Sequence, residues 1–204
     1  MTKKMIESFG PKYKVEPDVS AACYFYAMAL VLGTKAKVNG VHLNSLQGDI
    51  IFLELLEQMG ADIKDENDGV LVDASLVTSF EGLEVDMKDF SDQALTFAVV
   101  AAFAKTPSVI RNVGHIRHQE SNRMMVIKSE LEKIGCSVEI KEDDIFITPG
   151  SLHGAEIETY EDHRVAMSFA IAGLRVENIV IQNPKCCEKT FANYFEILDE
   201  ITAF

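Results

Sequence analysis

Three stretches of the chain are apolar on nearly every side and rich in alanine. They are Val19–Leu32, Gln93–Ala104 and His163–Leu174. A helix without a polar face is a buried helix, and its small residues let neighbouring helices approach closely. An aspartate stands just ahead of each stretch or at its edge, as Asp18, Asp92 and Asp162. Such aspartates suit helix N-termini, so the pattern predicts three buried helices.

Each predicted buried helix is followed by a short strand and then by a second helix. The strands are expected at Lys35–Val41, Pro107–Val113 and Asn178–Asn183. The second helices keep apolar residues at helical spacing, in the sets Phe52, Leu55, Leu56 and Met59; Met124, Ile127, Leu131 and Ile134; and Phe191, Tyr194, Phe195, Leu198 and Ile201. Because these helices are amphipathic, we expect them to cover the buried ones.

A hairpin is expected at the end of the first two units. Gly60 and Gly135 are natural stops for the second helices, and the hairpins should turn at Asp65–Gly69 and Lys141–Asp144. The third unit ends at Phe204 without a hairpin. The pattern thus predicts two full α–β–α–ββ units and one incomplete unit. The strands that the third unit lacks come from elsewhere, are dispensable, or leave an unpaired sheet edge.

Composition narrows the class of protein. The chain has 204 residues, 48% apolar and 25% charged, which suits one or two globular domains. A formal net charge of -13 argues against a nucleic-acid partner. No run approaches the roughly 20 apolar residues of a membrane span, and the first residues lack the apolar region expected of a secretory signal. The cysteines, which follow no disulfide or metal-binding pattern and indicate buried thiols in a reducing cytoplasm, are Cys23, Cys136, Cys186 and Cys187.

A few cationic residues stand where the N-terminal ends of the predicted helices should gather. In so acidic a chain, a local cationic cluster suggests a site for a small anion. Arg164 is expected in the first turn of the third buried helix. Arg123 and Glu120 are expected at the start of the second unit's amphipathic helix, and Lys189 at the start of the third's. The cations could clamp a phosphate and a carboxylate, while Asp92 and Glu120 are candidates for proton transfer.

Each candidate also has a purely structural interpretation. Asp92 could be no more than a helix cap, although Ser91 could cap that helix instead. Glu120 and Arg123, three residues apart, could form a solvated ion pair on a helix surface. Asp162 could be a cap, and His163 could be a mere helix-start residue. Lys185 and Lys189 could be surface lysines. Only their convergence on one face would favour a site.

Several motifs closely resemble the 5-enolpyruvylshikimate-3-phosphate synthase family. They lie at Val15–Ala22, Asn44–Asp49, Arg117–Arg123, Tyr160–Met167 and Pro184–Tyr194. The resemblance implies an α/β fold of repeated βαβαββ-type units around buried parallel helices, an enolpyruvyl transferase-like inverse α/β prism. The family has two such domains. Residues 15–204 would be the carboxy-terminal one, and residues 1–14 a remnant of the amino-terminal half and its junction.

The resemblance also implies an activity. Members of the family join shikimate 3-phosphate to phosphoenolpyruvate and release phosphate, by addition and then elimination, in chorismate and aromatic amino acid biosynthesis. Neither a metal nor an organic cofactor is implied. The partners would be these two anionic substrates and the missing amino-terminal domain, in the cytoplasm. Because the resemblance covers about half of the usual enzyme, we expect the chain to be truncated and inactive alone.

Roles are carried over by motif position. Asp92 would take up the proton of the attacking shikimate hydroxyl, and Glu120 would help to protonate the phosphoenolpyruvate methylene, together with Lys189. Phosphoenolpyruvate itself would be held by Arg123, Arg164 and Lys189, with His163 close by. Fixed cations of this kind would stabilise charge that develops in the tetrahedral intermediate.

The chain departs from the family pattern at positions expected to bind substrate. The family usually has Lys where this chain has Gln119, and Asp where it has Asn122. His115 stands where the family often has a different polar residue. We therefore expect contact with shikimate 3-phosphate to be altered. Two alternatives stay open: a UDP-N-acetylglucosamine enolpyruvyl transferase domain, and a non-catalytic binding fragment.

Overall fold

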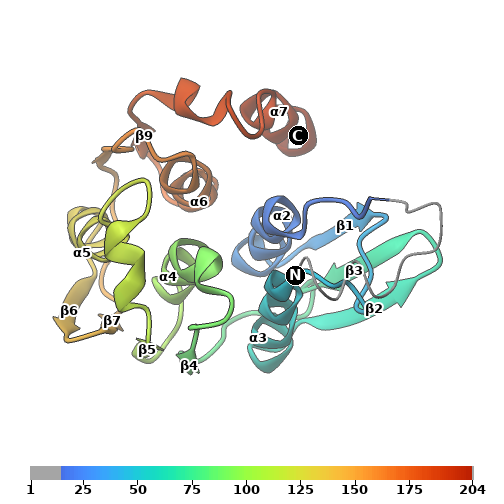
Figure 1. Cartoon of the computed structure of the whole chain (residues 1–204), viewed down its shortest axis with the longest axis horizontal. Helices are drawn as coiled ribbons and strands as arrows, with labels where there is room; N and C mark the ends of the chain where they lie inside the picture. The colour runs from blue at the N-terminus through green and yellow to red at the C-terminus, as the bar shows by residue number, and fades with distance from the viewer. Residues whose placement is uncertain (1–14, 204) are drawn as a thin grey trace. The chain divides into compact units, whose positions relative to one another are not determined.

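The computed structural model describes residues 15–203, and the chain divides into two compact units between Thr78 and Ser79. Figure 1 traces both along the chain. The interpretation of residues 1–14 as a remnant lies outside the described residues. The order α, β, α, β, β that the sequence pattern predicts recurs at residues 19–73 and at residues 94–148. No helix within residues 15–203 is long and apolar enough to cross a bilayer.

The first unit contains the first predicted buried helix with the predicted bounds. Helix α2 spans Val19–Leu32, and Asp18 caps it by accepting a 3.1 Å hydrogen bond from the backbone N–H of Ala21. Gly33, in the left-handed conformation at φ 64°, ends the helix. Glycine adopts this conformation without steric cost, which makes it a common helix stop.

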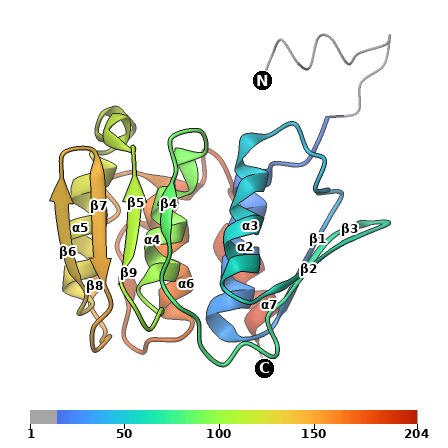
Figure 2. The ribbon, with the colours of Figure 1, turned by 90° about the horizontal axis from the view of Figure 1, so that it is seen from below.

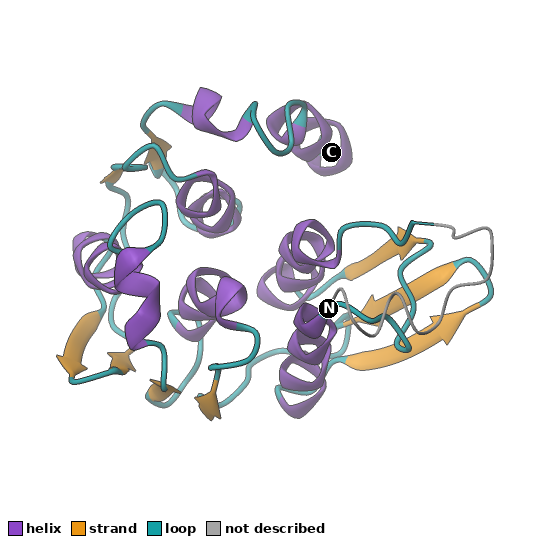
Figure 3. Cartoon of the chain, in the orientation of Figure 1, coloured by secondary structure: helices purple, strands orange, loops and turns teal. Residues whose placement is uncertain are grey.

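The same unit holds a three-stranded antiparallel sheet. Its strands are β1 (Lys35–Asn39), β2 (Asp62–Glu66) and β3 (Gly69–Asp73), in the order β1-β3-β2. A 3-10 helix, η1 (Gly48–Ile51), leads into α3 (Phe52–Gln58). Figure 3 shows α2 and α3 beside the strands. The predicted apolar set from Phe52 to Met59 is buried, because α3 packs against α2.

The second unit begins with a strand that the hydrophobic pattern did not reveal. Strand β4 (Glu84–Asp86) pairs in parallel with β5 (Ser108–Arg111), and β5 pairs with the hairpin of β6 (Ser137–Lys141) and β7 (Asp144–Thr148). The sheet order is β4-β5-β7-β6, and Figure 2 shows these strands side by side with helices behind them. With β4 included, this part of the chain is a complete βαβαββ unit.

The helices of this unit are η2 (Ser91–Gln93), α4 (Ala94–Ala101), η3 (Gly114–His118) and α5 (Arg123–Lys133). Every residue of α4 is buried, as its uniformly apolar sequence predicts. The predicted range Gln93–Ala104 is too long at both ends, because a 3-10 turn precedes α4 and residues 102–104 form turns and a bend. Gly135, at φ 106°, follows α5 as predicted; a Cβ there would lie 2.4 Å from the carbonyl oxygen of Ser151.

The remaining elements are β8 (Glu156–Ile157), α6 (His163–Gly173), β9 (Val180–Ile181), η4 (Pro184–Cys187) and α7 (Tyr194–Thr202). Strand β8 pairs in parallel with β9, and within residues 79–203 no hairpin adds to this pair. The apolar face of α7 is accordingly only partly buried, with Tyr194 buried and Ile201 46% exposed.

Helices α4 and α6 pack against each other at the centre of the second unit. Their contact includes the buried hydroxyls of Thr96 and Ser168, 3.3 Å apart. The cysteines, predicted to be buried thiols, are free and buried in both units: Cys23, Cys136, Cys186 and Cys187. The packing of α4 against α6 thus holds the two helices together, and the candidate residues Asp92 and Arg164 lie near their N-terminal ends.

Candidate functional site

The centre of the candidate site is an ion pair buried in the second unit. Arg123, the first residue of α5, is 3% exposed, and Asp162, the N-cap of α6, is fully buried. The guanidinium donates from Nε to Asp162 Oδ2 at 2.8 Å and from Nη2 to Oδ1 at 3.2 Å. This two-point geometry is the strong form of an arginine–carboxylate pair, and it fastens α5 to α6.

Asp162 is also held by other donors. Ser121 Oγ donates to Oδ2 at 2.9 Å, and the backbone N–H of Arg164 donates to Oδ1 at 3.0 Å. Burial acts to raise the pKa of Asp162, but hydrogen bonds and charge from Arg123, with the other donors, outweigh it and lower the pKa. Asp162 therefore stays ionised inside the protein, where it orients Arg123.

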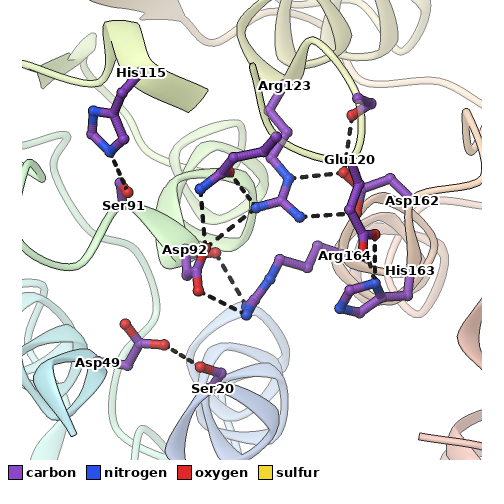
Figure 4. Close-up of polar contacts among 12 residues, drawn as sticks. Ser20, Asp49, Ser91, Asp92, His115, Glu120, Arg123, Asp162, His163 and Arg164 are labelled. Carbon is purple, nitrogen blue, oxygen red and sulfur yellow. Dashed lines mark hydrogen bonds and ion pairs between the residues drawn. The ribbon is translucent and has the colours of Figure 1, made fainter. Parts of the chain in front are cut away.

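Two guanidinium groups meet at Asp92, which lies in η2 just before α4. Arg164 Nη2 donates to Asp92 Oδ2 at 3.0 Å, and Arg123 Nη1 donates to Oδ1 at 3.3 Å. Gln119 joins this group, because its carbonyl oxygen accepts from Arg123 Nη1 and its amide contacts Asp92 at 3.4 Å. Figure 4 shows the side chains converging from separate elements. The side chain of Asp92 is 42% exposed, so a ligand can reach it.

A second carboxylate, Glu120, connects two further groups that can carry protons. His163 Nδ1 lies 2.9 Å from Oε2, and Lys189 Nζ lies 3.0 Å from Oε1. The Glu120 side chain is 38% exposed, whereas that of His163 is only 10% exposed. Burial lowers the pKa of His163, and the neighbouring charge of Arg164 acts in the same direction while Glu120 opposes it. His163 therefore favours its neutral form, in which one ring nitrogen accepts and the other donates.

His115 lies at the edge of this cluster. Its Nε2 is 2.7 Å from the hydroxyl of Ser91, the residue before Asp92. Figure 4 shows this contact beside the larger network. His115 thus joins the site through the 3-10 turn that carries Asp92. The second unit therefore brings together the residues predicted to act in catalysis or substrate binding: Asp92, His115, Gln119, Glu120, Arg123, His163, Arg164 and Lys189.

The structure corrects several local expectations. Neither η2 nor α4 has a side-chain cap, so Asp92 does not act as one. Glu120 lies in the loop between η3 and α5, and Lys189 lies between η4 and α7, so neither begins a helix. Glu120 and Arg123 do not pair as a solvated helix pair, because Arg123 is buried against other carboxylates. Lys189 does lie at the surface, with its side chain 49% exposed, and its contact with Glu120 joins it to the cluster.

Sequence reasoning missed the part played by Asp162 and Ser121. Asp162 does cap α6, as predicted, but it also neutralises Arg123, which lies 39 residues earlier in the sequence. The only local signal was an aspartate at a helix start, which a cap alone explains. The N-terminal ends of α4 and α6 meet at the Arg164–Asp92 contact. The prediction that the end of α2 joins them stays a prediction, because α2 belongs to the other unit.

The first unit has a polar cluster of its own, which serves the fold. Ser20 Oγ donates to Asp49, and Gln47 Oε1 accepts from the backbone N–H of Val19 at 3.0 Å. Glu16 accepts from Ser45 Oγ at 2.6 Å, and this hydrogen bond is the largest cause that lowers the pKa of Glu16. These bonds tie the start of α2 to η1 and to the loop before it. They organise that loop locally.

Three residues of the site could be suspected of binding a metal ion. Potential ligand atoms of Glu120, Asp162 and His163 lie within 4.8 Å of one another. Both oxygens of Asp162 already accept from Arg123, and Glu120 already pairs with Lys189. A metal would have to displace these cations, so the donor set is organised for ion pairing instead.

Protonation of His163 should weaken the folded state in mildly acidic solution. Because the folded state lowers its pKa, the unfolded chain binds the proton first as the pH falls below about 6.5. The contribution of neutral His163 to the free energy of unfolding is therefore fully present above that pH. It is lost as the pH falls through the pKa of His163 in the folded protein. We expect His163→Gln to remove this part of the decline between pH 7 and pH 5, measured by urea unfolding. Exposed His153, replaced in the same way, is the control; a decline unchanged in His163→Gln would contradict the assignment.

The fold and the site together define an α/β domain of repeated units that gathers arginine, lysine and carboxylate groups at the ends of central helices. The family model of EPSP synthase (3-phosphoshikimate 1-carboxyvinyltransferase) matches residues 4–198. The chain therefore belongs to the EPSP synthase family. Its architecture is the α/β fold of that family, covering about half of the solved enzyme.

Named relatives agree with this assignment. The chain is 47% identical over 183 residues to the 3-phosphoshikimate 1-carboxyvinyltransferase of Nostoc punctiforme, covering 90% of this chain and 42% of that protein. It is 42% identical to 3-phosphoshikimate 1-carboxyvinyltransferase 2 of Nicotiana tabacum, covering 94% of this chain and 60% of that protein. The EPSP synthase of Acinetobacter baumannii superposes with a TM-score of 0.83 at 25% identity, covering 98% of this chain and 53% of that one. The chain thus spans about half the length of proteins it matches.

Proposed function

We propose that the chain supplies the phosphoenolpyruvate-binding half of a 3-phosphoshikimate 1-carboxyvinyltransferase. In this proposal residues 15–204 correspond to the carboxy-terminal domain of the family. The relatives that carry this name are about twice as long, so the shikimate 3-phosphate site would need the rest of their fold. The location would be the cytoplasm, and the product would feed chorismate synthesis.

The observation that carries the proposal is the pair of reachable carboxylates held by fixed cations. Asp92 and Glu120 are 42% and 38% exposed, and each contacts cationic side chains. An incoming phosphate or carboxylate can replace a carboxylate oxygen at Arg164 or Lys189 without reorganising the buried Arg123. Preorganised cations are the main means by which an enzyme stabilises a developing anion.

The proposed chemistry assigns one proton transfer to each carboxylate. Asp92 would accept the proton of the shikimate hydroxyl as its oxygen adds to phosphoenolpyruvate. Glu120 would help to deliver a proton to the methylene carbon, which becomes a methyl group in the tetrahedral intermediate. Lys189, in contact with Glu120, can resupply that proton, while neutral His163 orients the carboxylate. Elimination of phosphate, with a methyl proton returning to Glu120, would then form the enol ether of the product.

Arg164 provides the direct test of anion binding. Replacing it with methionine keeps much of the aliphatic stem but removes the donors that would face phosphoenolpyruvate. We expect affinity for phosphoenolpyruvate to fall about 10- to 150-fold, the effect of losing hydrogen bonds to a charged group. Binding is measured by NMR titration of the chain, alone and mixed with the amino-terminal half of the Nostoc punctiforme relative, with and without shikimate 3-phosphate.

Arg175→Met is the matched control, because Arg175 follows the opposite end of the same helix and its guanidinium lies 5.5 Å from the Phe103 ring centre. It removes the same charge and should leave affinity unchanged. Equal losses in the two variants would contradict a local site. Binding without turnover in the complemented chain would favour the non-catalytic fragment, and turnover with UDP-N-acetylglucosamine in place of shikimate 3-phosphate would favour the related transferase.

A further inference from the structure

A second buried carboxylate on α5 has no part in the chemistry proposed above. Glu130 has no exposed surface, and it accepts from three donors. Its Oε1 accepts from the hydroxyl of Tyr160 at 2.8 Å, and its Oε2 accepts from the backbone N–H of Glu158 at 3.0 Å. Lys133 Nζ completes the set at 2.7 Å. An ionised group is placed in a protein interior only when such partners compensate for its lost hydration.

Glu130 and Arg123 lie on one face of α5. The spacing from Arg123 through Ile127 to Glu130 is i, i+4 and i+7, and all of these side chains are buried. One face of the helix thus presents a cation at its start and an anion two turns later. Both charges contact the same short segment, the loop between β8 and α6, which ends at Asp162.

That loop needs outside support. Tyr160 and Glu161 have φ values of 54° and 56°, a left-handed conformation that residues with a side chain rarely adopt. Consecutive residues of this kind persist when their surroundings fix them. Glu130 holds the loop by its hydrogen bonds to Glu158 and Tyr160. The loop then ends at Asp162, which contacts Arg123. Burial, followed by the hydrogen bond to Glu130, raises the pKa of Tyr160 to about 12, so its hydroxyl stays a donor.

We propose that Glu130 is a positioning residue: it holds the loop before α6 so that Asp162, His163 and Arg164 meet Arg123, Glu120 and Asp92. Its effect on substrate binding acts through these residues and rests on the proposed function. Its effect on the position of the loop does not depend on that function.

Glu130→Gln tests this in the full chain. Glutamine has the same size but only one acceptor oxygen, so its NH₂ group must face either the Tyr160 hydroxyl or the Glu158 N–H. We expect the Nε–H NMR signal of Arg123, which donates to Asp162 at 2.8 Å, to shift and to exchange about tenfold faster, the effect of one weakened hydrogen bond. The pKa of His163, read from its imidazole signals, should also move.

Glu132→Gln is the matched control on the same helix, because the side chain of Glu132 is 41% exposed and pairs with Lys128. It should leave both signals as in wild type. Tyr160→Phe removes only the hydroxyl and provides a milder test if Glu130→Gln fails to fold. A variant that melts earlier but keeps the Arg123 signal and the His163 titration would overturn the proposal, because Glu130 would then only stabilise the fold.

Phosphoenolpyruvate titration separates this proposal from the one on which it partly rests. We expect about tenfold weaker binding in Glu130→Gln, as misplaced donors no longer match the anion. A wild-type chain that does not bind phosphoenolpyruvate contradicts the proposed function, while the NMR comparison still decides the part played by Glu130. Unchanged affinity in Glu130→Gln, beside a wild type that binds, would contradict its action on substrate.

Discussion

Replacement of Arg123 by methionine is expected to lower the free energy of unfolding of the second unit by about 3–5 kcal/mol. The substitution leaves Asp162, which is fully buried, without its charge partner. Removing one member of a buried ion pair costs more than the pair itself contributes, because an uncompensated charge stays in a poorly polarisable interior. Asp92 loses only one of its partners and is exposed enough to be hydrated.

Urea unfolding measures this loss when it is followed through amide NMR signals of α4 and α6. Arg117→Met is the control: Arg117 pairs with Asp143 at 2.8 Å, but their side chains are 31% and 65% exposed. We expect the control to cost about 0–1 kcal/mol, as solvated pairs do. Adding Asp162→Asn to Arg123→Met should recover part of the loss, because the amide carries no charge yet still accepts from Arg164 N–H. A loss below about 1 kcal/mol in Arg123→Met would contradict a buried ion pair.

The second large effect is expected for Glu120→Gln in the chain mixed with the amino-terminal half of the Nostoc punctiforme relative. If Glu120 takes part in proton transfer, turnover should fall about 10²- to 10⁴-fold. Glutamine keeps the size of the side chain and one acceptor for His163 or Lys189, so the binding groups stay near their places. We therefore expect kcat to carry the loss, with little change in KM for phosphoenolpyruvate. Phosphate release with both substrates present is the measurement.

Glu139→Gln serves as the control for charge, because Glu139 lies exposed on β6 and pairs with Lys141. Its turnover should equal that of the unchanged chain. Stability of Glu120→Gln should stay within about 0.5 kcal/mol of wild type, since Glu120 is partly exposed. A loss of less than tenfold, or one that appears in KM alone, would mean that Glu120 orients Lys189 and His163 without carrying a proton.

The sequence predicted most elements because their information is local. A uniformly apolar run such as Val19–Leu32 can be satisfied only by a buried helix, and the predicted bounds match α2. The hairpins in the first two units follow from alternating apolar residues around polar turns. Strands β4 and β8 have three and two residues, which is too short for an alternation to show. They are strands because they pair with β5 and β9, and the residues near them in the sequence do not indicate that pairing.

The same division applies to the site. Charge and position near predicted helix starts made Asp92, Glu120, Arg123 and Arg164 candidates, and the family resemblance gave them roles. Their partners were not visible. Glu120 pairs with His163, 43 residues away, and not with its neighbour Arg123. Such partners depend on which helices pack together, and sequence separation does not record this.

What the sequence by itself determined is the set of buried helices and covering helices, and the family to which the chain belongs. Tertiary structure alone decided which carboxylate neutralises which cation. The physical reason is that a buried charge requires a partner at hydrogen-bond distance, and packing of α5 against the loop before α6 chooses that partner. Asp162 shows the difference: as a residue in a sequence it is a helix cap, and in the folded protein it is the anion that fixes Arg123.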